Sequence, residues 1–406
     1  MRRVAITGIG VVSSIGVGVD AVAASLRDAT SGVSRSESFA ERGFRCQVAA
    51  APDLDIEDAL DRKTRRFMGE GAAWNYIAMR EAIADARLVD DEVSHPMTGI
   101  IMGSGGPSTE TIVAAAQKTI DTGATKKIGP TQVPKAMSST NSATLAVPYK
   151  ILGVNYSISS ACATSVHCIG AAAEQIQWGK QDVVFAGGGE DLHWTLANMF
   201  DAMGAMTTKF NDTPSTASRA YDKNRDGFVI AGGAGVLVLE EMERAKARGA
   251  TIYGEIVGYA ANSDGYDMVQ PSGEGAVRCM RAALETVRAP VDYINTHGTS
   301  TPIGDSRETQ AIRDVFGKEI PPFSSTKSLT GHSLGATGVQ ETIFSLIMMR
   351  DRFLAESAHI EELDPEFEGL PIVRERVDDA KIDCFLTNSF GFGGTNGCLV
   401  VARSED

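Results

Sequence analysis

Cys162 is the residue of this chain whose surroundings best suit a nucleophile. It follows a predicted buried strand and precedes a predicted buried helix over 163–179, in the run NYSISSACATSVHCIG. A helix start presents unpaired N–H groups and partial positive charge, which stabilise a thiolate and predict a lowered pKa for this thiol. Its neighbours Ala161 and Ala163 are small and leave room for a substrate. Most cysteines are inert core residues instead, and Cys168 in the same helix fits that description.

Two of the six histidines lie in loops that suit a binding site. His297 ends a predicted strand, in NTHGTSTPIGD, and His332 precedes an apolar helix, in TKSLTGHSLGATG. Loops at the carboxyl ends of strands are where α/β sheets bind ligands. The two histidines and the cysteine at a helix start therefore favour one shared catalytic site. A zinc site built on Cys162, His167 and Cys168 is disfavoured because no second ligand pair follows at a suitable spacing, and no metal is expected.

The polar residues after His297 allow two interpretations. Thr299 and Thr301 could hydrogen-bond an amide-bearing arm of a substrate. Asp305 and Glu308 have the spacing of a capping box, which predicts that a helix over 306–316 opens there and assigns them no catalytic role.

A serine hydrolase is the alternative enzyme class. The run Gly331-His332-Ser333-Leu334-Gly335 fits the G-x-S-x-G pattern of a nucleophile elbow, with Ser333 as the nucleophile. The elbow needs a strand directly before the serine, but SLTG separates the nearest predicted strand from it. His359 is the only later histidine, close behind Asp351.

The elements that would position these residues alternate between strands and helices, which indicates an α/β fold. Strands are predicted at 4–12, 98–104, 154–159, 182–188 and 235–241, and helices at 72–88 and 163–179. After about residue 250 the alternation restarts, with strands in IYGEIVGYA, VDYINT, CFLTNSF and CLVVAR and helices in AVRCMRAALETV, SRETQAIRDVF and VQETIFSLIMMR.

Two internal echoes indicate a duplication. A strand, a serine-rich turn and a long apolar helix occur in SISSAC followed by 163–179, and again in FSSTKSLTGHS followed by 335–350. An aromatic residue, a Gly-Gly pair and an apolar strand occur at 228–241 and at 390–403, each interpreted as a hairpin that closes one half. We therefore predict two halves, 1–250 and 251–406, that pack as one body.

Composition restricts the class of protein. The 406 residues are 43% hydrophobic and 22% charged, as in a soluble globular enzyme, and the net charge of −14 disfavours a nucleic-acid binder. The sequence contains no stretch of eighteen consecutive apolar residues, so no membrane span is predicted. The six cysteines are scattered and no export signal is convincing, so a cytoplasmic location is expected.

A small basic cluster contrasts with this acidic background. Arg62, Lys63 and Arg66 lie close together, and Lys126 and Lys127 form a second, smaller group. Such runs are usually solvated surface. The more specific interpretation is a docking surface for an acidic partner.

At these motifs, and nearly from end to end, the sequence resembles the β-ketoacyl–acyl carrier protein synthases, most closely the bacterial type I enzymes. The resemblance rests on NYSISSACATSVHCIGAAAEQIQWGKQDVVFAGGGED, NTHGTSTPIGD, STKSLTGHSLGATGVQE and NSFGFGGTN. It implies a thiolase fold, which is a duplicated five-layer α-β-α-β-α body, and a homodimer. A non-enzymatic scaffold with that fold is a third possibility.

The resemblance also implies a reaction, the decarboxylative condensation that elongates fatty acids by two carbons. Cys162 would accept an acyl group from acyl carrier protein, and malonyl–acyl carrier protein would then lose carbon dioxide. His297 and His332 would donate hydrogen bonds to the resulting enolate as neutral imidazoles. Lys327 and Glu341 would orient and tune His332.

The remaining roles follow from the same resemblance. The backbone N–H groups of Cys162 and Phe392 would form an oxyanion hole, Thr299 and Thr301 would hold the pantetheine arm, and Phe228 and Phe392 would flank the entrance. Met203 and Gly106 would contact the substrate, Gly106 at the acyl pocket. Pro107 departs from the glycine usual in that loop. No metal and no cofactor of the enzyme's own are implied, because the phosphopantetheine belongs to the carrier protein.

Overall fold

A computed structural model describes residues 1–404, and its main feature is an 11-stranded sheet that repeats one strand order twice. The first half contributes β1 (Val4–Ser13), β5 (Thr98–Gly103), β6 (Asn155–Tyr156), β7 (Val183–Glu190) and β8 (Gly233–Glu241). The second half contributes β9 (Gly254–Ser263), β10 (Tyr293–Asn295), β11 (Phe323–Ser324), β14 (Cys384–Gly391) and β15 (Thr395–Ala402). Each half has its strands in the spatial order third, second, fourth, fifth, first.

Strand directions repeat as well. In the first half β5 runs parallel to β6 and β7, and β8 is antiparallel to β7 and β1. In the second half β10 runs parallel to β11 and β14, and β15 is antiparallel to β14 and β9. The expected duplication is therefore confirmed. The boundary expected at residue 250 lies between α12 (Met242–Ala247) and β9, and it stays a prediction.

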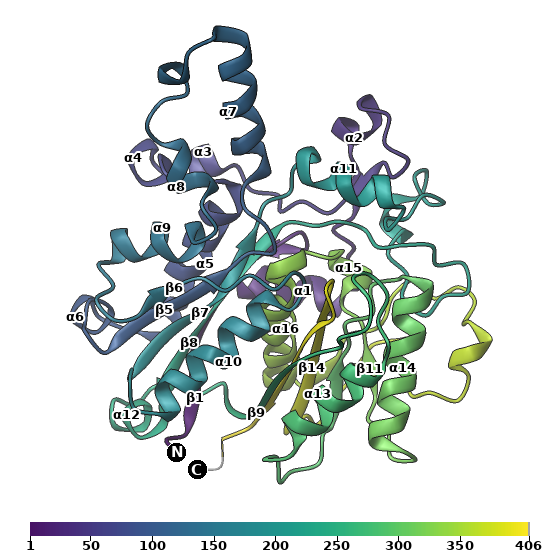
Figure 1. Ribbon diagram of the computed structural model, residues 1–406. Helices are drawn as coiled ribbons and strands as arrows, with labels where there is room; N and C mark the ends of the chain where they lie inside the picture. The colour runs from purple at the N-terminus through teal and green to yellow at the C-terminus, as the bar shows by residue number, and fades with distance from the viewer. Residues whose placement is uncertain (405–406) are drawn as a thin grey trace.

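Two helices fill the middle of the body, between the two halves of the sheet (Figure 1). They are α10 (Thr164–Gln177) and α16 (Thr337–Asp351), which contact each other and follow the third strands β6 and β11. Residues 337–349 of α16 are buried on every side, as a helix covered on all faces requires. These are the two helices of the predicted echo, and the structure confirms it.

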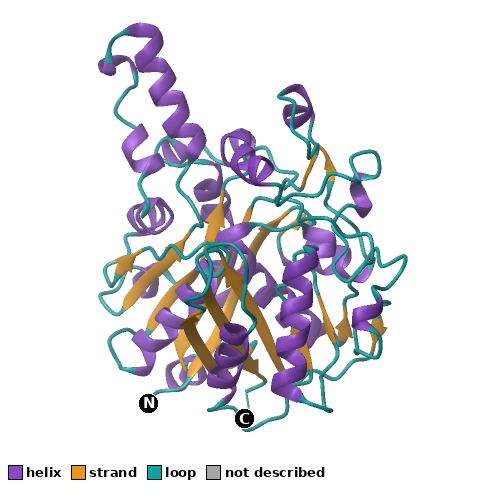
Figure 2. Ribbon diagram, turned by 45° about the vertical axis from the view of Figure 1, so that its right-hand side comes forward, coloured by secondary structure: helices purple, strands orange, loops and turns teal. Residues whose placement is uncertain are grey.

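Outer helices complete the five layers (Figures 1 and 2). The outer face of the first half is covered by α5 (Glu70–Ala86), and that of the second half by α13 (Glu274–Leu284) and α14 (Pro302–Phe316). Along β8, Leu237 and Leu239 join the central core, whereas Val236 and Val238 join the outer core under α5. This alternation of side chains gives each sheet face its own hydrophobic core. The expected α-β-α-β-α architecture is confirmed.

Two glycines bring α5 close to β1. A Cβ atom on Gly10 would lie 2.0 Å from the carbonyl oxygen of Ala78, and one on Gly8 would lie 2.5 Å from that of Ala82. No other residue type fits this approach, so the Gly-Ile-Gly run serves helix–strand packing.

Three local expectations are wrong. The hairpin predicted at 228–241 does not form, because β8 pairs with β7, and residues 191–232 connect these two strands. The hairpin predicted near the C-terminus does form, between β14 and β15. The strand predicted at 154–159 is reduced to β6 at the sheet edge. The helix predicted at 306–316 begins four residues earlier, at Pro302, whose missing N–H suits the first position of a helix.

The remaining elements surround this body. They are β2 (Gly16–Val17), α1 (Val19–Arg27), β3 (Ser34–Arg35), α2 (Glu37–Glu41), β4 (Val48–Ala49), α3 (Ile56–Ala59), α4 (Arg62–Arg65), α6 (Asp90–Val93), α7 (Thr109–Thr122), η1 (Thr125–Lys127), α8 (Gln132–Ala136), α9 (Thr140–Tyr149), α11 (Trp194–Met203), η2 (Pro214–Thr216), α15 (Lys327–Thr330), η3 (Leu334–Ala336), β12 (Phe353–Leu354), η4 (Pro365–Phe367) and β13 (Val377–Asp378). Helix α7 projects from the body (Figure 1). Within residues 1–404, no helix has the length and apolar character needed to span a bilayer.

Candidate active site

Cys162 lies on a tight turn directly before α10, whose N-cap is Ala163. The preceding residue, Ala161, has a left-handed φ of 50°, which is uncommon for a residue with a Cβ and is found where a site imposes strain. Cys162 lines a cavity of about 330 Å³, and its Sγ atom lies 3.0 Å from Nε2 of His332.

The lowered pKa expected for this thiol is wrong. Burial raises the pKa of Cys162 to about 12, although the charge of Lys327 acts in the opposite direction. The free-energy cost of removing the thiolate from water exceeds the stabilisation that Lys327 and the helix start provide. The resting thiol is therefore protonated, and His332 is the nearest group able to accept its proton.

His297 and His332 face each other beside the cysteine, with ring centroids 5.2 Å apart and planes at 85°. Burial lowers the pKa of both well below the usual histidine value, and the positive charge of Lys327 lowers both further. Both rings are therefore neutral near pH 7. Neither Nδ1 atom has a hydrogen-bond partner in the described part of the chain, so no contact fixes which ring nitrogen carries the proton.

Backbone contacts hold both histidine loops in place. The carboxylate of Glu308 accepts the N–H groups of His297 and Gly298, both at 2.8 Å. The backbone of His332 pairs with the segment 229–231, through its N–H to Val229 O at 2.8 Å and its carbonyl to the N–H of Ala231 at 2.9 Å. The imidazoles thus have fixed positions before any substrate binds.

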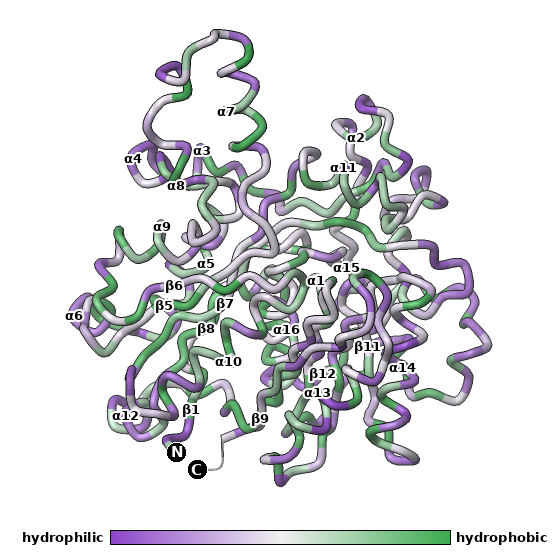
Figure 3. The backbone as a smooth tube through the Cα atoms, viewed as in Figure 1, coloured by the Kyte–Doolittle hydropathy of each residue, from purple (hydrophilic) through white to green (hydrophobic). Residues whose placement is uncertain are grey.

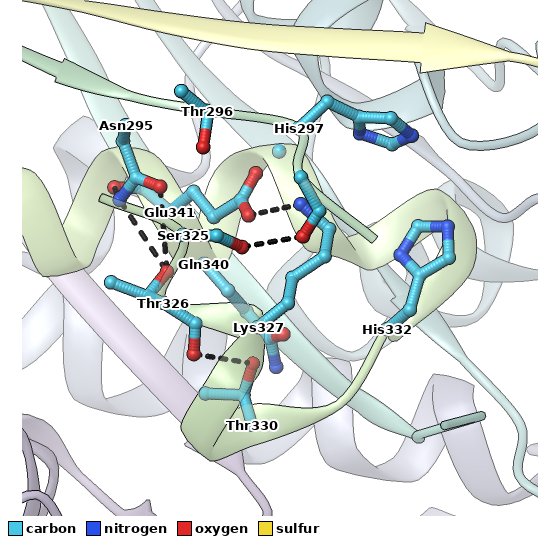
Figure 4. Close-up of polar contacts among 12 residues, drawn as sticks. Asn295, Thr296, His297, Ser325, Thr326, Lys327, Thr330, His332, Gln340 and Glu341 are labelled. Atoms are coloured by element: carbon cyan, nitrogen blue, oxygen red, sulfur yellow. Dashed lines mark hydrogen bonds and ion pairs between the residues drawn. The ribbon is translucent and has the colours of Figure 1, made fainter. Parts of the chain in front are cut away.

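Lys327 and Glu341 form a buried ion pair behind the histidines (Figure 4). Neither residue lines the cavity. Burial raises the pKa of Glu341 to about 7, against the opposing charge of Lys327. The second carboxylate oxygen, Oε2, has no partner among the described residues. The pair therefore acts on the cavity through its charge on the imidazoles.

The cavity reaches the surface where its lining residues are exposed, and these residues, among them Met203, Gln270 and Arg307, come from both halves and mark its mouth. It brings together most of the side chains expected to contact a substrate, namely Met203, Phe228, Thr299, Thr301 and Phe392. The hydroxyls of Thr299 and Thr301 lie 3.0 Å apart, and the ring of Phe228 meets that of His332 edge-on, with centroids 5.6 Å apart.

The end of β14, at Gly391, passes directly over the cysteine. A Cβ atom on Gly391 would lie 3.1 Å from the backbone nitrogen of Cys162, so only glycine fits there. Within residues 1–404, the backbone N–H of Phe392 has no hydrogen-bond partner, and the backbone N–H of Cys162 contacts its own thiol. The Phe392 donor is available to a bound ligand.

Gly106 is the one expected substrate residue that does not line this cavity. A Cβ atom there would meet nothing within 4 Å. Its loop is held by Glu190, whose carboxylate accepts the N–H groups of Gly105 at 2.5 Å, Gly106 at 3.3 Å and Gly335 at 2.8 Å. Burial raises the pKa of Glu190 to about 8.

Sequence reasoning missed the roles of four residues in and around the site. The capping-box interpretation of Asp305 and Glu308 is wrong, because both lie inside α14 and accept backbone N–H groups from the loop after β10. The ring of Phe390 meets that of His297 at 5.9 Å, and Phe200 lines the cavity beside Phe228. Pro302 signalled the true helix start and could have revealed Glu308.

The hydrolase alternative finds no support. Ser333 is buried, and its hydroxyl donates to Oε1 of Gln340 at 2.6 Å rather than to an imidazole. His359 is half-buried elsewhere, with Nδ1 3.2 Å from the carbonyl oxygen of Ser218. These two residues do not form the pair that a serine nucleophile requires.

Metal-ligating atoms come together at one place in the described part of the chain. Those of Cys162, His297 and His332 lie within 4.8 Å of one another. His167, one of the residues considered for zinc, instead contacts Ser160 Oγ at 2.6 Å and the carbonyl oxygen of Asn396 at 3.1 Å.

The basic residues expected to dock a partner are all exposed. Arg62 and Lys63 lie on α4, and Arg66 is its C-cap. Lys126 and Lys127 lie in η1, which follows the outer end of the projecting helix α7 (Figure 1). The two groups are therefore on separate elements of one chain.

Comparisons with known proteins point to one family. The N-terminal domain of β-ketoacyl synthases matches residues 1–245, and the C-terminal domain matches residues 253–361. The 3-oxoacyl-[acyl-carrier-protein] synthase 1 of Haemophilus influenzae is 56% identical over 403 residues, which is 99% of both sequences. The protein of the same name from Escherichia coli is 55% identical over 407 residues, covering all of both.

Solved structures agree with the fold. A β-ketoacyl synthase from Burkholderia phymatum superimposes with a TM-score of 0.93 at 35% identity, over the full length of both chains. A ketosynthase in complex with its type II acyl-carrier protein, bound to a hexaketide, superimposes with a TM-score of 0.90 at 28% identity, again over both full lengths.

Proposed function

The chain belongs to the β-ketoacyl synthase family, and from that membership we propose that it is a 3-oxoacyl-[acyl-carrier-protein] synthase that elongates fatty acids. The observation that carries this function is the approach of the Cys162 thiol to two neutral imidazoles in one cavity. The thiol would hold the growing acyl chain, and the imidazoles would stabilise negative charge on the second substrate.

The first step transfers an acyl group to the cysteine. Nε2 of His332 takes the thiol proton, and the thiolate attacks the carbonyl carbon of an acyl–acyl carrier protein thioester. The N–H groups of Cys162 and Phe392 hold the oxyanion that forms. The carrier thiol then leaves with the proton from His332. An acyl-Cys162 thioester and a free carrier thiol result.

The second step generates the carbon nucleophile. Malonyl–acyl carrier protein enters, its carboxylate leaves as carbon dioxide, and the bonding electron pair forms an enolate of the carrier thioester. Nε2–H groups of His297 and His332 donate to the enolate oxygen. His332 accepted a proton at Nε2 in the first step, so its ring must now carry its own proton on Nε2; its Nδ1 has no partner in the described part of the chain that would oppose this change of tautomer. Each donor of this kind contributes a factor of roughly 10²–10³ in rate. Neutral rings suit this role because each can donate an N–H without adding a second buried positive charge to that of Lys327.

The third step joins the carbons. The enolate carbon attacks the acyl-Cys162 carbonyl, the tetrahedral oxyanion again rests on the two backbone N–H groups, and the C–S bond breaks. The Cys162 thiolate takes up one proton from the solvent as the 3-oxoacyl carrier product departs, which balances the loss of the malonyl carboxylate as carbon dioxide. Product formation from acyl and malonyl carrier proteins, followed by mass spectrometry together with carbon dioxide release, tests the proposal. A hydrolase would release free fatty acid instead.

Substrate contacts follow the cavity. Thr299 and Thr301 would hold the amides of the pantetheine arm, with Phe228, Met203 and Phe392 along its path. Gly106 would border the acyl chain in a pocket separate from the cavity described above. The empty space around its Cα, where an added Cβ would meet nothing within 4 Å, supports this role. The enzyme needs no cofactor of its own in this scheme, because the carrier protein brings the phosphopantetheine.

A second copy of the chain would cover an apolar face around α7. Ile120, Val133 and Val147 are 75%, 76% and 78% exposed, although all are apolar, and α7 carries hydrophobic stretches (Figure 3). Edge strand β6 contacts α9, the helix that carries Val147, and has one side unpaired within the single chain. Apolar patches and bare edges of this kind favour association. Sedimentation equilibrium should give a dimer for the wild type and a monomer for Val147→Asp; a monomeric wild type would contradict the homodimer.

Carrier-protein docking and location complete the proposal. Arg62, Lys63 and Arg66, with Lys126 and Lys127, would attract an acidic carrier against the net charge of −14. All six cysteines are free thiols, as suits a reducing cytoplasm.

A further inference from the structure

Among residues 1–404, Arg307 is the only lysine or arginine that lines the cavity. It lies on the exposed side of α14, at the cavity mouth, and its aliphatic stem packs against Gly273, the N-cap of α13, with Cδ 3.8 Å from the position of an added Cβ. Its guanidinium has no hydrogen bond and no ion pair within residues 1–404. An arginine at a cavity mouth with five unused donors is available to an anion.

The acidic residues of the same cavity are already occupied. Asp264 accepts from the backbone and hydroxyl of Ser272 and from the N–H of Gly275. Asp267 accepts two backbone N–H groups, and Glu308 holds the histidine loop. None of them pairs with Arg307, so the guanidinium is not neutralised by its own protein.

Its basic neighbours are engaged too. Arg307 also borders a shallow groove between α13 and α14 that contains Arg278 and Arg281. Arg278 donates to the carbonyl oxygen of Ser263 and lies 4.0 Å from Glu274, and Arg281 donates to the carbonyl oxygen of Asp314. Of the three arginines that border this groove, Arg307 alone also lines the cavity and alone has no partner within residues 1–404, which favours an anionic ligand beside it.

We propose that Arg307 binds the phosphate of the phosphopantetheine arm as it enters the cavity. This inference rests on the proposed function, since the arm carries its thioester at one end and its phosphate at the other. With the thioester at Cys162 and the amides beside Thr299 and Thr301, the phosphate end points toward the mouth. Guanidinium groups match phosphate oxygens bidentately.

The test compares malonyl thioesters of pantetheine, of phosphopantetheine and of carrier protein. Wild-type enzyme should have a lower KM for the phosphopantetheine thioester than for the pantetheine thioester. Arg307→Ala should raise the first KM roughly three- to tenfold, as the loss of one exposed charge-assisted contact implies, and the second by less than twofold. Arg278→Ala, in the same groove but outside the cavity, is the matched control and should keep the wild-type preference.

Binding without turnover separates this inference from the proposed function. Calorimetry with phosphopantetheine and with pantetheine should show tighter binding of the phosphorylated compound, and Arg307→Ala should remove the difference. Equal changes for both compounds would overturn the inference, as would an effect confined to carrier-protein substrates, which would place Arg307 against protein surface. If the enzyme condenses all three thioesters with no preference for the phosphorylated compound, the role of Arg307 in binding phosphate is refuted, whereas the proposed function still holds.

Discussion

Nε2 of His332 lies 3.0 Å from Sγ of Cys162, in a site where burial raises the pKa of the thiol to about 12. At neutral pH the reactive thiolate is therefore scarce unless the proton can move to a neighbour, and His332 is that neighbour. His297 faces His332 and has no such contact with the sulfur.

The first prediction separates the two histidines. His332→Ala should slow acylation of Cys162 by roughly tenfold or more, a common contribution of a general base, whereas His297→Ala should acylate at close to the wild-type rate. Both variants should lose malonyl decarboxylation. Single-turnover acylation with a radiolabelled acyl–acyl carrier protein measures the difference. Equal acylation by both variants would show that His332 is not the base.

The second prediction concerns the buried cation. Lys327→Met should raise the pKa of both histidines, because the charge of Lys327 helps to lower them. The rings would then become imidazolium at a higher pH, and the acid limb of the rate profile should move upward. Glu341→Gln keeps the cation and is the control, with no upward movement expected. Removing one partner of a buried pair also costs about 3–5 kcal/mol of stability, measurable by urea unfolding.

The third prediction concerns Glu190 and stability. Its pKa is raised to about 8 in the folded protein, so between its usual value and pH 8 the folded state binds the extra proton. Stability from this group is present at low pH and is lost as pH rises toward 8. Glu190→Gln should flatten the fall in unfolding free energy over that range by up to about 1.4 kcal/mol per pH unit. Urea titrations at several pH values give the slopes; parallel slopes would disprove the assignment.

The fourth prediction concerns the docking surface. Lys63→Glu with Arg66→Glu should raise the KM for carrier-protein substrates and weaken its dependence on salt, since exposed charges act mainly on association. Turnover of a pantetheine thioester should change far less. Arg288→Glu with Arg374→Glu, two exposed arginines outside the surface, is the charge-matched control. Equal losses on both substrates would mean that α4 supports the fold and is not the docking site.

Much of the site was predictable because its chemistry is local in sequence. Cys162 before a buried helix, and His297 and His332 in glycine-rich loops, were recognisable from neighbouring residues alone. The pKa of Cys162 was not, because burial by distant segments outweighs the effect of the helix start. Glu308 was assigned to a cap for a related reason, since its partner His297 is reached only through tertiary folding.

The fold shows the same division. The repeated strand and helix echo predicted the duplication, because each half must bury a similar set of faces. The hairpin at 228–241 was wrong because β8 chooses its partners β1 and β7 from far along the chain, and a Gly-Gly pair does not specify such pairing. Arg307 gave no signal in sequence, since only the packing of α14 against the loop before α13 brings it to the cavity mouth.

The most direct test of the account is the identity of the acylated residue. The enzyme is incubated briefly with acyl–acyl carrier protein, without malonyl substrate, and digested for peptide mass mapping. The account predicts one acyl group on the peptide that contains Cys162, removable by hydroxylamine and absent from Cys162→Ala. An acyl group on Ser333, or no acylated residue at all in folded enzyme, would contradict it.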